Sequence, residues 1–143
     1  GDIETVNGGI RLGRGAQVKD DIELVNGGVR IGDQASVGGD VGNVNGGISI
    51  GEAEVGGSVT TTNGDITLEG STVRGSLRVE KPQGWRWGKQ RLPRVVIGEG
   101  SVVEGELVFE QEVELYVHPG ARVGKQTGVQ PRLIDSPDAP RAD

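Results

Sequence analysis

Apolar and polar residues alternate along most of the chain, in short runs that glycines separate. Five of these runs carry two aliphatic residues with a single residue between them. The ten aliphatic positions are Ile10, Leu12, Val29, Ile31, Ile48, Ile50, Ile66, Leu68, Val95 and Ile97. A period of two is typical of a strand that buries one face. The pattern therefore predicts a series of short strands whose core is a stack of these ten side chains.

The runs belong to an internal repeat of 18–19 residues. Four units occupy 2–20, 21–39, 40–57 and 58–75, a fifth spans 76–105 around an insert, and a sixth occupies 106–125. A unit this short has no core of its own and must stack on its neighbours. We therefore predict an all-β fold, a three-sided parallel β-solenoid (β-helix) of about six coils, with a right-handed coil favoured over a left-handed one. The solenoid domain is expected at 1–125, with an insert loop at 80–93 in coil 5, and a C-terminal cap or tail at 126–143.

Two sets of residues recur where the chain must turn a corner. An Asn-Gly pair stands at one position of four successive units, with the asparagines Asn7, Asn26, Asn45 and Asn63. Asn and Gly tolerate the left-handed backbone of a sharp corner, and stacked asparagines can hydrogen-bond as a ladder. A binding loop is the functional alternative for this pair. A second corner is expected at Gly13, Gly32, Gly51 and Gly98. A small residue follows each of them two or three positions later, at Ala16, Ala35, Ala53 and Ser101.

Composition narrows the function classes. The 143 residues include 27 glycines, four aromatic residues and no cysteine. These counts exclude a helical bundle, disulfides, thiolate metal sites and cysteine nucleophiles. The formal net charge of −6 argues against nonspecific binding to nucleic acid. No apolar run approaches the length of a membrane span, so no membrane-spanning segment is expected.

Three families share features of the repeat. The pieces IGDQAS, IGEAEV and IGEGSV resemble the hexapeptide motif of left-handed β-helix acyltransferases. The whole unit, with its Asn-Gly core and its start of Gly, then Asp or Ser, then an aliphatic residue, more closely resembles an adhesin-like β-strand repeat family of bacteria. It is also similar to the polymer-forming bactofilin class. The last two resemblances imply a scaffold without catalytic residues. The adhesin-like one implies a periplasmic or cell-envelope location, and the bactofilin one implies end-to-end polymerisation and a cytoplasmic location.

Little in the sequence indicates catalysis or a cofactor. His118, the single histidine, would have to act as general base in a hexapeptide-type acyltransferase, but a His-Pro pair is also typical of a plain turn. Asp2, Asp21 and Asp40 share one repeat position, which suggests either a Ca²⁺ row or a solvated acidic edge. The run 60–62 of three threonines invites an ice-binding interpretation, but the first three coils lack it. We expect no cofactor, no metal and no enzymatic activity.

The insert is basic and carries half of the aromatic residues. Trp85 and Trp87 alternate across Arg86, so both indoles are expected to face one side. The candidate binding loop comprises Lys81, Trp85, Arg86, Trp87, Lys89 and Arg91. In one interpretation the insert is a flap whose cations meet Glu104, Glu106, Glu110 and Glu112. In the other it recognises a glycan or an anionic envelope polymer, because indoles stack on sugar faces and bind cations.

The leading hypothesis is therefore a structural, non-enzymatic scaffold of the bacterial cell envelope that is self-associating or adhesive. The alternatives are a glycan- or anionic-polymer-binding module and, third, an acyltransferase. The chain opens inside a repeat, so coil 1 is expected to present unpaired strand edges that pair with another chain. At the other end, Val129, Leu133 and Ile134 are expected to cover coil 6.

Overall fold

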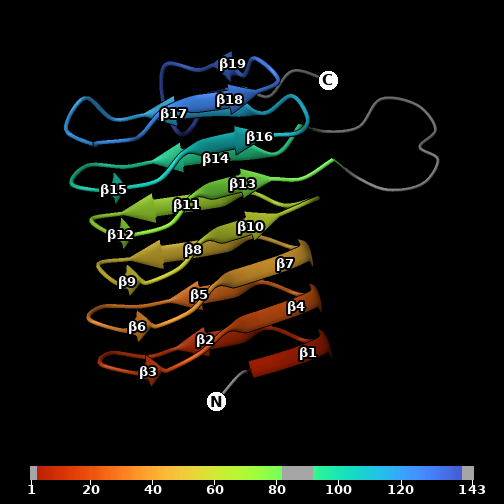
Figure 1. Cartoon of the computed structure of the whole chain (residues 1–143), viewed down its shortest axis with the longest axis vertical. Coiled ribbons are helices and arrows are strands. Elements are labelled where there is room, and N and C mark those ends of the chain that lie inside the picture. Colours follow the sequence, from red (N-terminus) through yellow and green to blue (C-terminus); the bar gives the residue numbers. More distant parts are fainter. Residues whose placement is uncertain (1–2, 82–91, 140–143) are drawn as a thin grey trace.

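The structure is a computed structural model that describes residues 3–81 and 92–139. Within these ranges the chain forms 19 strands and no helix, and the strands stack into three parallel sheets (Figure 1). Sheet A contains β1 (Ile3–Asn7), β4 (Ile22–Asn26), β7 (Val41–Asn45), β10 (Val59–Thr61), β13 (Leu77–Val79), β16 (Leu107–Phe109) and β18 (Gln126–Gly128). Sheet B contains β2 (Ile10–Leu12), β5 (Val29–Ile31), β8 (Ile48–Gly51), β11 (Ile66–Glu69), β14 (Arg94–Ile97), β17 (Glu114–Val117) and β19 (Arg132–Leu133). Sheet C contains β3 (Gln17–Val18), β6 (Ser36–Val37), β9 (Glu54–Val55), β12 (Thr72–Val73) and β15 (Val102–Val103).

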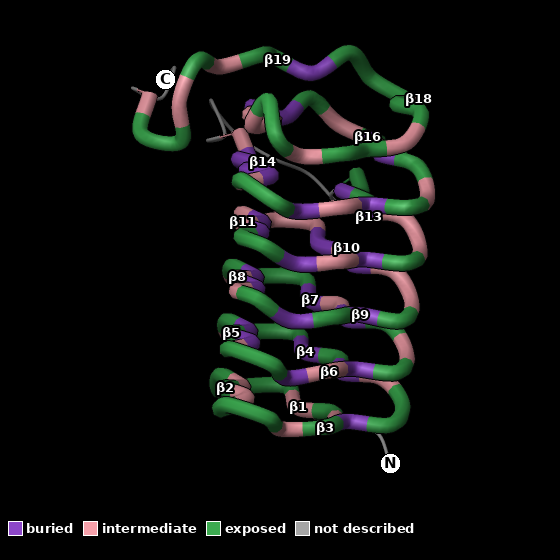
Figure 2. Tube along the Cα trace, turned by 90° about the vertical axis from the view of Figure 1, so that its left-hand side faces the viewer, coloured by how far each residue is buried: buried purple, intermediate pink, exposed green. Residues whose placement is uncertain are grey.

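The predicted fold class is confirmed: the chain is an all-β solenoid of about six turns with parallel sheets. Each of the first five coils contributes one strand to each sheet, so the three sheets are the three sides (Figure 2). Every strand pairs with the equivalent strand of the next coil, as Ile22 does with Val41. The hand of the coil stays a prediction.

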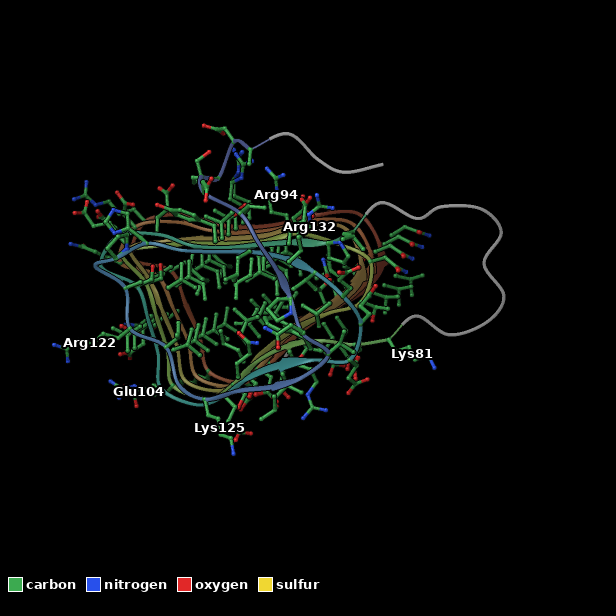
Figure 3. The ribbon with its side chains drawn as sticks, turned by 90° about the horizontal axis from the view of Figure 1, so that it is seen from above. Lys81, Arg94, Glu104, Arg122, Lys125 and Arg132 are labelled. Atoms are coloured by element: carbon green, nitrogen blue, oxygen red, sulfur yellow. The ribbon has the colours of Figure 1, made fainter. Side chains whose placement is uncertain are left out.

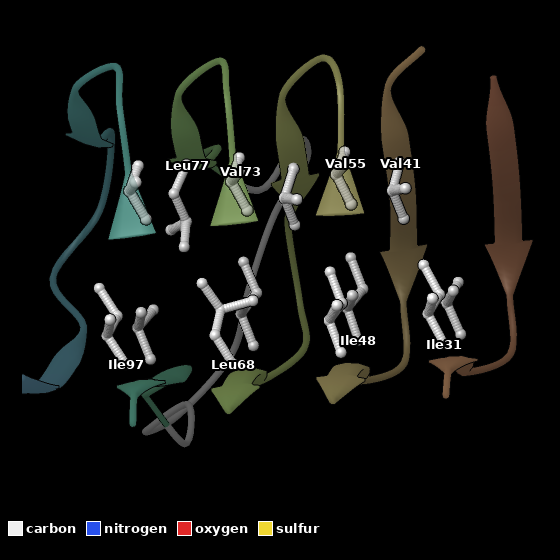
Figure 4. Packing of buried hydrophobic residues seen from close by; sticks show 14 of the residues in the cluster. Ile31, Val41, Ile48, Val55, Leu68, Val73, Leu77 and Ile97 are labelled. Atoms are coloured by element: carbon white, nitrogen blue, oxygen red, sulfur yellow. The ribbon is translucent and has the colours of Figure 1, made fainter. Parts of the chain in front are cut away.

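The core is the predicted aliphatic stack, extended by two further stacks from the other sides. Eight of the ten predicted residues are at most 2% exposed, whereas Ile10 and Leu12 are half-buried because they lie in the first coil. Sheet A adds buried aliphatic residues such as Val41 and Leu77, and sheet C adds a column of valines that includes Val55 (Figure 4). Burying such a side chain is worth about 1.5–3 kcal/mol. Repetition of this burial in every coil compensates for the short strands.

The second corner differs from its prediction. Among the described residues it is not Gly13, Gly32, Gly51 and Gly98 that adopt a left-handed backbone. The left-handed residues lie one or two positions further on, at Gly15, Gln34, Glu52, Gly70 and Gly100. Two of these five are not glycine, so the predicted series marked the start of the corner rather than its turning point.

The C-terminal segment also differs from a simple tail. Strands β18 and β19 extend sheets A and B by one strand each, so strand pairing continues beyond residue 125. Val129 and Leu133, which were expected to cover coil 6, are 43% and 72% exposed. Leu133 lies in register with Leu115 of the core stack, but no described residue packs above it.

The register predicts the effect of a charge in the core. Ile31 is 1% exposed and pairs with Leu12 below and Ile50 above. We expect Ile31→Asp to lower the free energy of unfolding by several kcal/mol in thermal or urea unfolding, because the carboxylate has no polar partner there. Ser49→Asp is the matched control. Ser49 belongs to the next coil and stands between the core residues Ile48 and Ile50 in the sequence, but its own side chain faces outward. Equal stability of the two variants would contradict the register.

Candidate functional sites

The corner asparagines form a ladder along the solenoid axis. The side-chain amide of each donates to the side-chain oxygen of the one below, over 3.1 Å from Asn26 to Asn7, 2.9 Å from Asn45 to Asn26 and 2.8 Å from Asn63 to Asn45. The glycine after each of the first three asparagines has a positive φ. A Cβ on Gly27 would overlap the backbone of the coil below. The Asn-Gly pair thus has a structural role, because it joins each corner to the corner of the coil below.

The ladder ends where the insert begins. In coil 5 the corner position falls at Glu80 and Lys81, and the side-chain amide of Gln111 reaches down from coil 6 to the carbonyls of Thr62 and Glu80, over 2.8 and 2.9 Å. The Lys81 backbone N–H donates to Glu110, while its side chain is exposed (Figure 3). The other members of the candidate binding loop, Trp85, Arg86, Trp87, Lys89 and Arg91, lie outside the described residues.

Two of the glutamates that were expected to receive the insert's cations are paired with arginines of the solenoid. Glu110 lies 3.2 Å from Arg78 in coil 5. Arg74 bridges two coils, with Glu54 at 2.8 Å and Glu104 at 3.4 Å. These side chains are 40–53% exposed, so each pair contributes at most about 1 kcal/mol.

The acidic row is part of a second ladder. The Asp21 carboxylate accepts the backbone N–H of Asp40 at 2.8 Å, and the Asp40 carboxylate accepts that of Ser58 at 2.7 Å. The hydroxyls of Ser58 and Ser76 continue the series by accepting the N–H groups of Ser76 and Glu106 at 3.0 and 3.1 Å. Sequence analysis missed the serines, although they share the repeat position. Asp2 lies outside the described residues. The carboxylates are used to join coils, which disfavours the Ca²⁺ interpretation.

Glycine precedes the ladder residue in most units for a steric reason. A Cβ on Gly39 would overlap the Asp21 carboxylate, and a Cβ on Gly57 would overlap that of Asp40. The oxygen that accepts the N–H of one coil occupies the space of a side chain at the preceding position. The start of Gly, then Asp or Ser, is therefore a requirement of stacking.

A buried ion pair fixes the C-terminal segment to the outer face of sheet B. Arg94 and Glu114 approach to 2.9 Å with side chains 8% and 2% exposed. The guanidinium of Arg94 also donates to the carbonyls of Pro137 and Ala139, at 2.7 and 2.6 Å (Figure 3). Residues of the predicted C-terminal cap or tail thus cover this pair. The sequence signal was weak, because Arg94 directly follows the basic insert and has no basic equivalent in the first four units.

The remaining candidates have local roles. The ring Nδ1 of His118 accepts the backbone N–H of Gly120 at 2.9 Å and so closes its own turn. Thr61 points inward and donates to Asn43 at 2.6 Å, whereas Thr60 and Thr62 are half-buried, so the three threonines do not form one flat row. Within residues 3–81 and 92–139, no three carboxylate or imidazole side chains gather as metal ligands would. The same residues contain no helix with the length and hydrophobicity that a membrane crossing requires.

Comparison with protein-family models, with curated proteins and with solved structures finds no match for this chain.

The Asp/Ser ladder makes a prediction about glycine substitutions. Gly57→Ala should lower the free energy of unfolding by about 1–3 kcal/mol, because the methyl group would displace the Asp40 carboxylate and crowd the Gly39 carbonyl. Gly51→Ala is the same chemical change at a position where a Cβ meets no atom within 4 Å, and it should leave stability unchanged or slightly raised. Urea unfolding of both variants checks this. Equal destabilisation would show that the ladder does not set the requirement for glycine.

The buried ion pair makes a second prediction. Arg94→Met should destabilise the protein by about 3–5 kcal/mol, because Glu114 would keep a buried charge without its partner. The carbonyls of Pro137 and Ala139 also lose their donor, so limited proteolysis should cut after residue 134 sooner than in the wild type. Arg74→Met removes two exposed ion pairs, so it should lower stability much less than Arg94→Met and leave the cleavage unchanged. An uncut C-terminal segment in Arg94→Met would contradict its attachment through this arginine.

Proposed function

We propose that the protein is a non-enzymatic structural scaffold, a rigid β-solenoid that self-associates through the edge of its first coil. The proposal rests on the strands at that edge, which lack a pairing partner on one side among the described residues. Strands β1, β2 and β3 each pair on one side only within the described residues. An unpaired strand edge is a template for the edge of another chain.

The interior of the solenoid is open at the same edge. Ile3, Ile10, Leu12 and Ala16 occupy core positions but are only partly buried, since no described residue lies below them. Asn7 is the lowest described rung of the asparagine ladder, and its amide N–H groups have no partner among the described residues. Pairing with a second chain would bury this apolar surface and supply acceptors to the backbone and to Asn7.

The upper end of the solenoid is less suited to association. Sheet C has no strand there beyond β15 among the described residues, so the last coil carries two strands instead of three. On sheet A the positions in register with Leu107 and Phe109 are Gln126 and Gly128, which offer little apolar surface, whereas Leu133 on sheet B is exposed. Two first coils related by a two-fold axis therefore make the more complementary contact, and it is a closed one.

The other hypotheses have less support. Binding of a glycan or an anionic polymer depends on Trp85 and Trp87, which lie outside the described residues. An acyltransferase would need His118 as its base, yet its Nδ1 is engaged within its own turn. Location in the cell envelope rests on the resemblance to adhesin-like repeats alone.

Sedimentation velocity tests the proposal. At micromolar concentrations the wild type should form dimers, and Ile10→Lys should weaken them by about tenfold or more, because it places a charge in the apolar contact. Thr72→Lys adds the same charge to the outer face of sheet C and is the control. Added salt should strengthen this association by screening the repulsion between the Glu4 side chains. A monomeric wild type at high salt, or equal effects of the two lysines, would overturn the proposal.

A further inference from the structure

The outer faces of sheets A and B carry rows of like charge in the first two coils. Glu4 and Glu23 are register partners on sheet A, and both are exposed. Arg11 and Arg30 are register partners on sheet B, and both are exposed as well. Like charges directly opposite each other on adjacent strands destabilise a sheet. Each row of like charges therefore destabilises the isolated chain.

No partner within the described chain relieves this repulsion. None of the four side chains makes an ion pair or a side-chain hydrogen bond with residues 3–81 or 92–139. Elsewhere on the surface, charges of opposite sign are neighbours across coils, as Arg74 is with Glu54 and Glu104. The first two coils stack like charges in register on two separate faces, negative on sheet A and positive on sheet B.

The two faces complement each other coil by coil. The central outward residues of sheet A are Glu4, Glu23, Gly42 and Thr60, and those of sheet B are Arg11, Arg30, Ser49 and Thr67. Matched by coil, they give two pairs of opposite charge, then two pairs of small neutral residues. Both rows have the spacing of the coils, about 4.8 Å, so one alignment satisfies all four positions at once.

We propose that a second copy of the chain lies alongside the first, with the two solenoid axes parallel. The outer face of sheet B of one copy then contacts the outer face of sheet A of the other, so that Glu4 meets Arg11 and Glu23 meets Arg30. This contact is distinct from the end contact proposed above and does not depend on it. It is also heterologous, which leaves one free face of each kind on every pair and allows further copies to add.

The shape of the sheet A face suits arginine side chains. A hollow of about 780 Å³ follows this face across the lower coils, lined by both glutamates and by a row of exposed valines. The valines are Val6, Val25 and Val44, which are 61%, 41% and 39% exposed. Arginine combines an aliphatic stem, which can lie on valine, with a guanidinium that pairs with a carboxylate in two-point geometry. The same surface thus accepts both parts of the side chain.

Charge reversal in trans tests the lateral contact. Arg11→Glu/Arg30→Glu carries glutamates on both faces, and Glu4→Arg/Glu23→Arg carries arginines on both. Each double variant alone should associate laterally about tenfold more weakly than the wild type in low-salt sedimentation. An equimolar mixture of the two should recover the association, because every A face then finds a B face of opposite charge. Circular dichroism of each variant checks that it is folded.

Salt separates this contact from the end contact. Lateral association should weaken as salt is added, whereas end association should strengthen, and Ile10→Lys should leave the lateral contact in place. Failure of the mixture to recover association would overturn the lateral contact without affecting the end contact. So would a wild type that stays monomeric at low salt but binds an arginine-rich peptide in the hollow, since the occupant would then not be a second copy.

Discussion

Parallel in-register pairing places each paired residue about 4.8 Å above its equivalent in the coil below, so wherever the repeat is kept a side chain has the same residue type as its nearest neighbour. The rest of the structure depends on how each residue type meets this constraint. Aliphatic side chains meet it by packing, as in the column through Ile31, Ile50 and Leu68. Asparagine meets it because its amide is both donor and acceptor and can bond to a copy of itself. Aspartate and serine meet it by accepting a backbone N–H of the next coil.

Charged rows cannot meet the same constraint within one chain. A carboxylate stacked on a carboxylate has no donor, and a guanidinium stacked on a guanidinium has no acceptor. In the upper coils the sign changes between coils at some positions, as between Arg74 and Glu104. The first two coils repeat the sign instead, and the sheet A row finds its complement only on sheet B. The association between copies that we propose would follow from the same stacking rule that builds the fold, which is why we favour a scaffold over a binding module or an enzyme.

The sequence predicts most of this fold because the repeat is nearly undisturbed. Period two identifies the strands, and the unit length predicts one coil per repeat. The asparagine ladder was predictable because the Asn-Gly pair recurs unchanged in four units, whereas the ladder through Ser58 and Ser76 was missed because its residue type changes from Asp to Ser after Asp40. The burial of the Arg94–Glu114 pair could not be predicted, since Pro137 and Ala139, which cover it, belong to a segment without periodicity. The insert has no equivalent in other coils either. The hypothesis that it binds a glycan or an anionic polymer therefore still rests on the sequence alone.

The register between coils is the claim on which all these arguments depend, and paired cysteines test it directly because the chain has none of its own. Ser49 and Thr67 are outward-facing register partners, so a Ser49→Cys/Thr67→Cys variant should form a disulfide on mild oxidation. Ser49→Cys/Glu69→Cys places the second cysteine two residues further along the same face, beyond disulfide reach. The account predicts cross-linking of the first variant only, measured by mass spectrometry. Cross-linking of the second variant, or of neither, would contradict it.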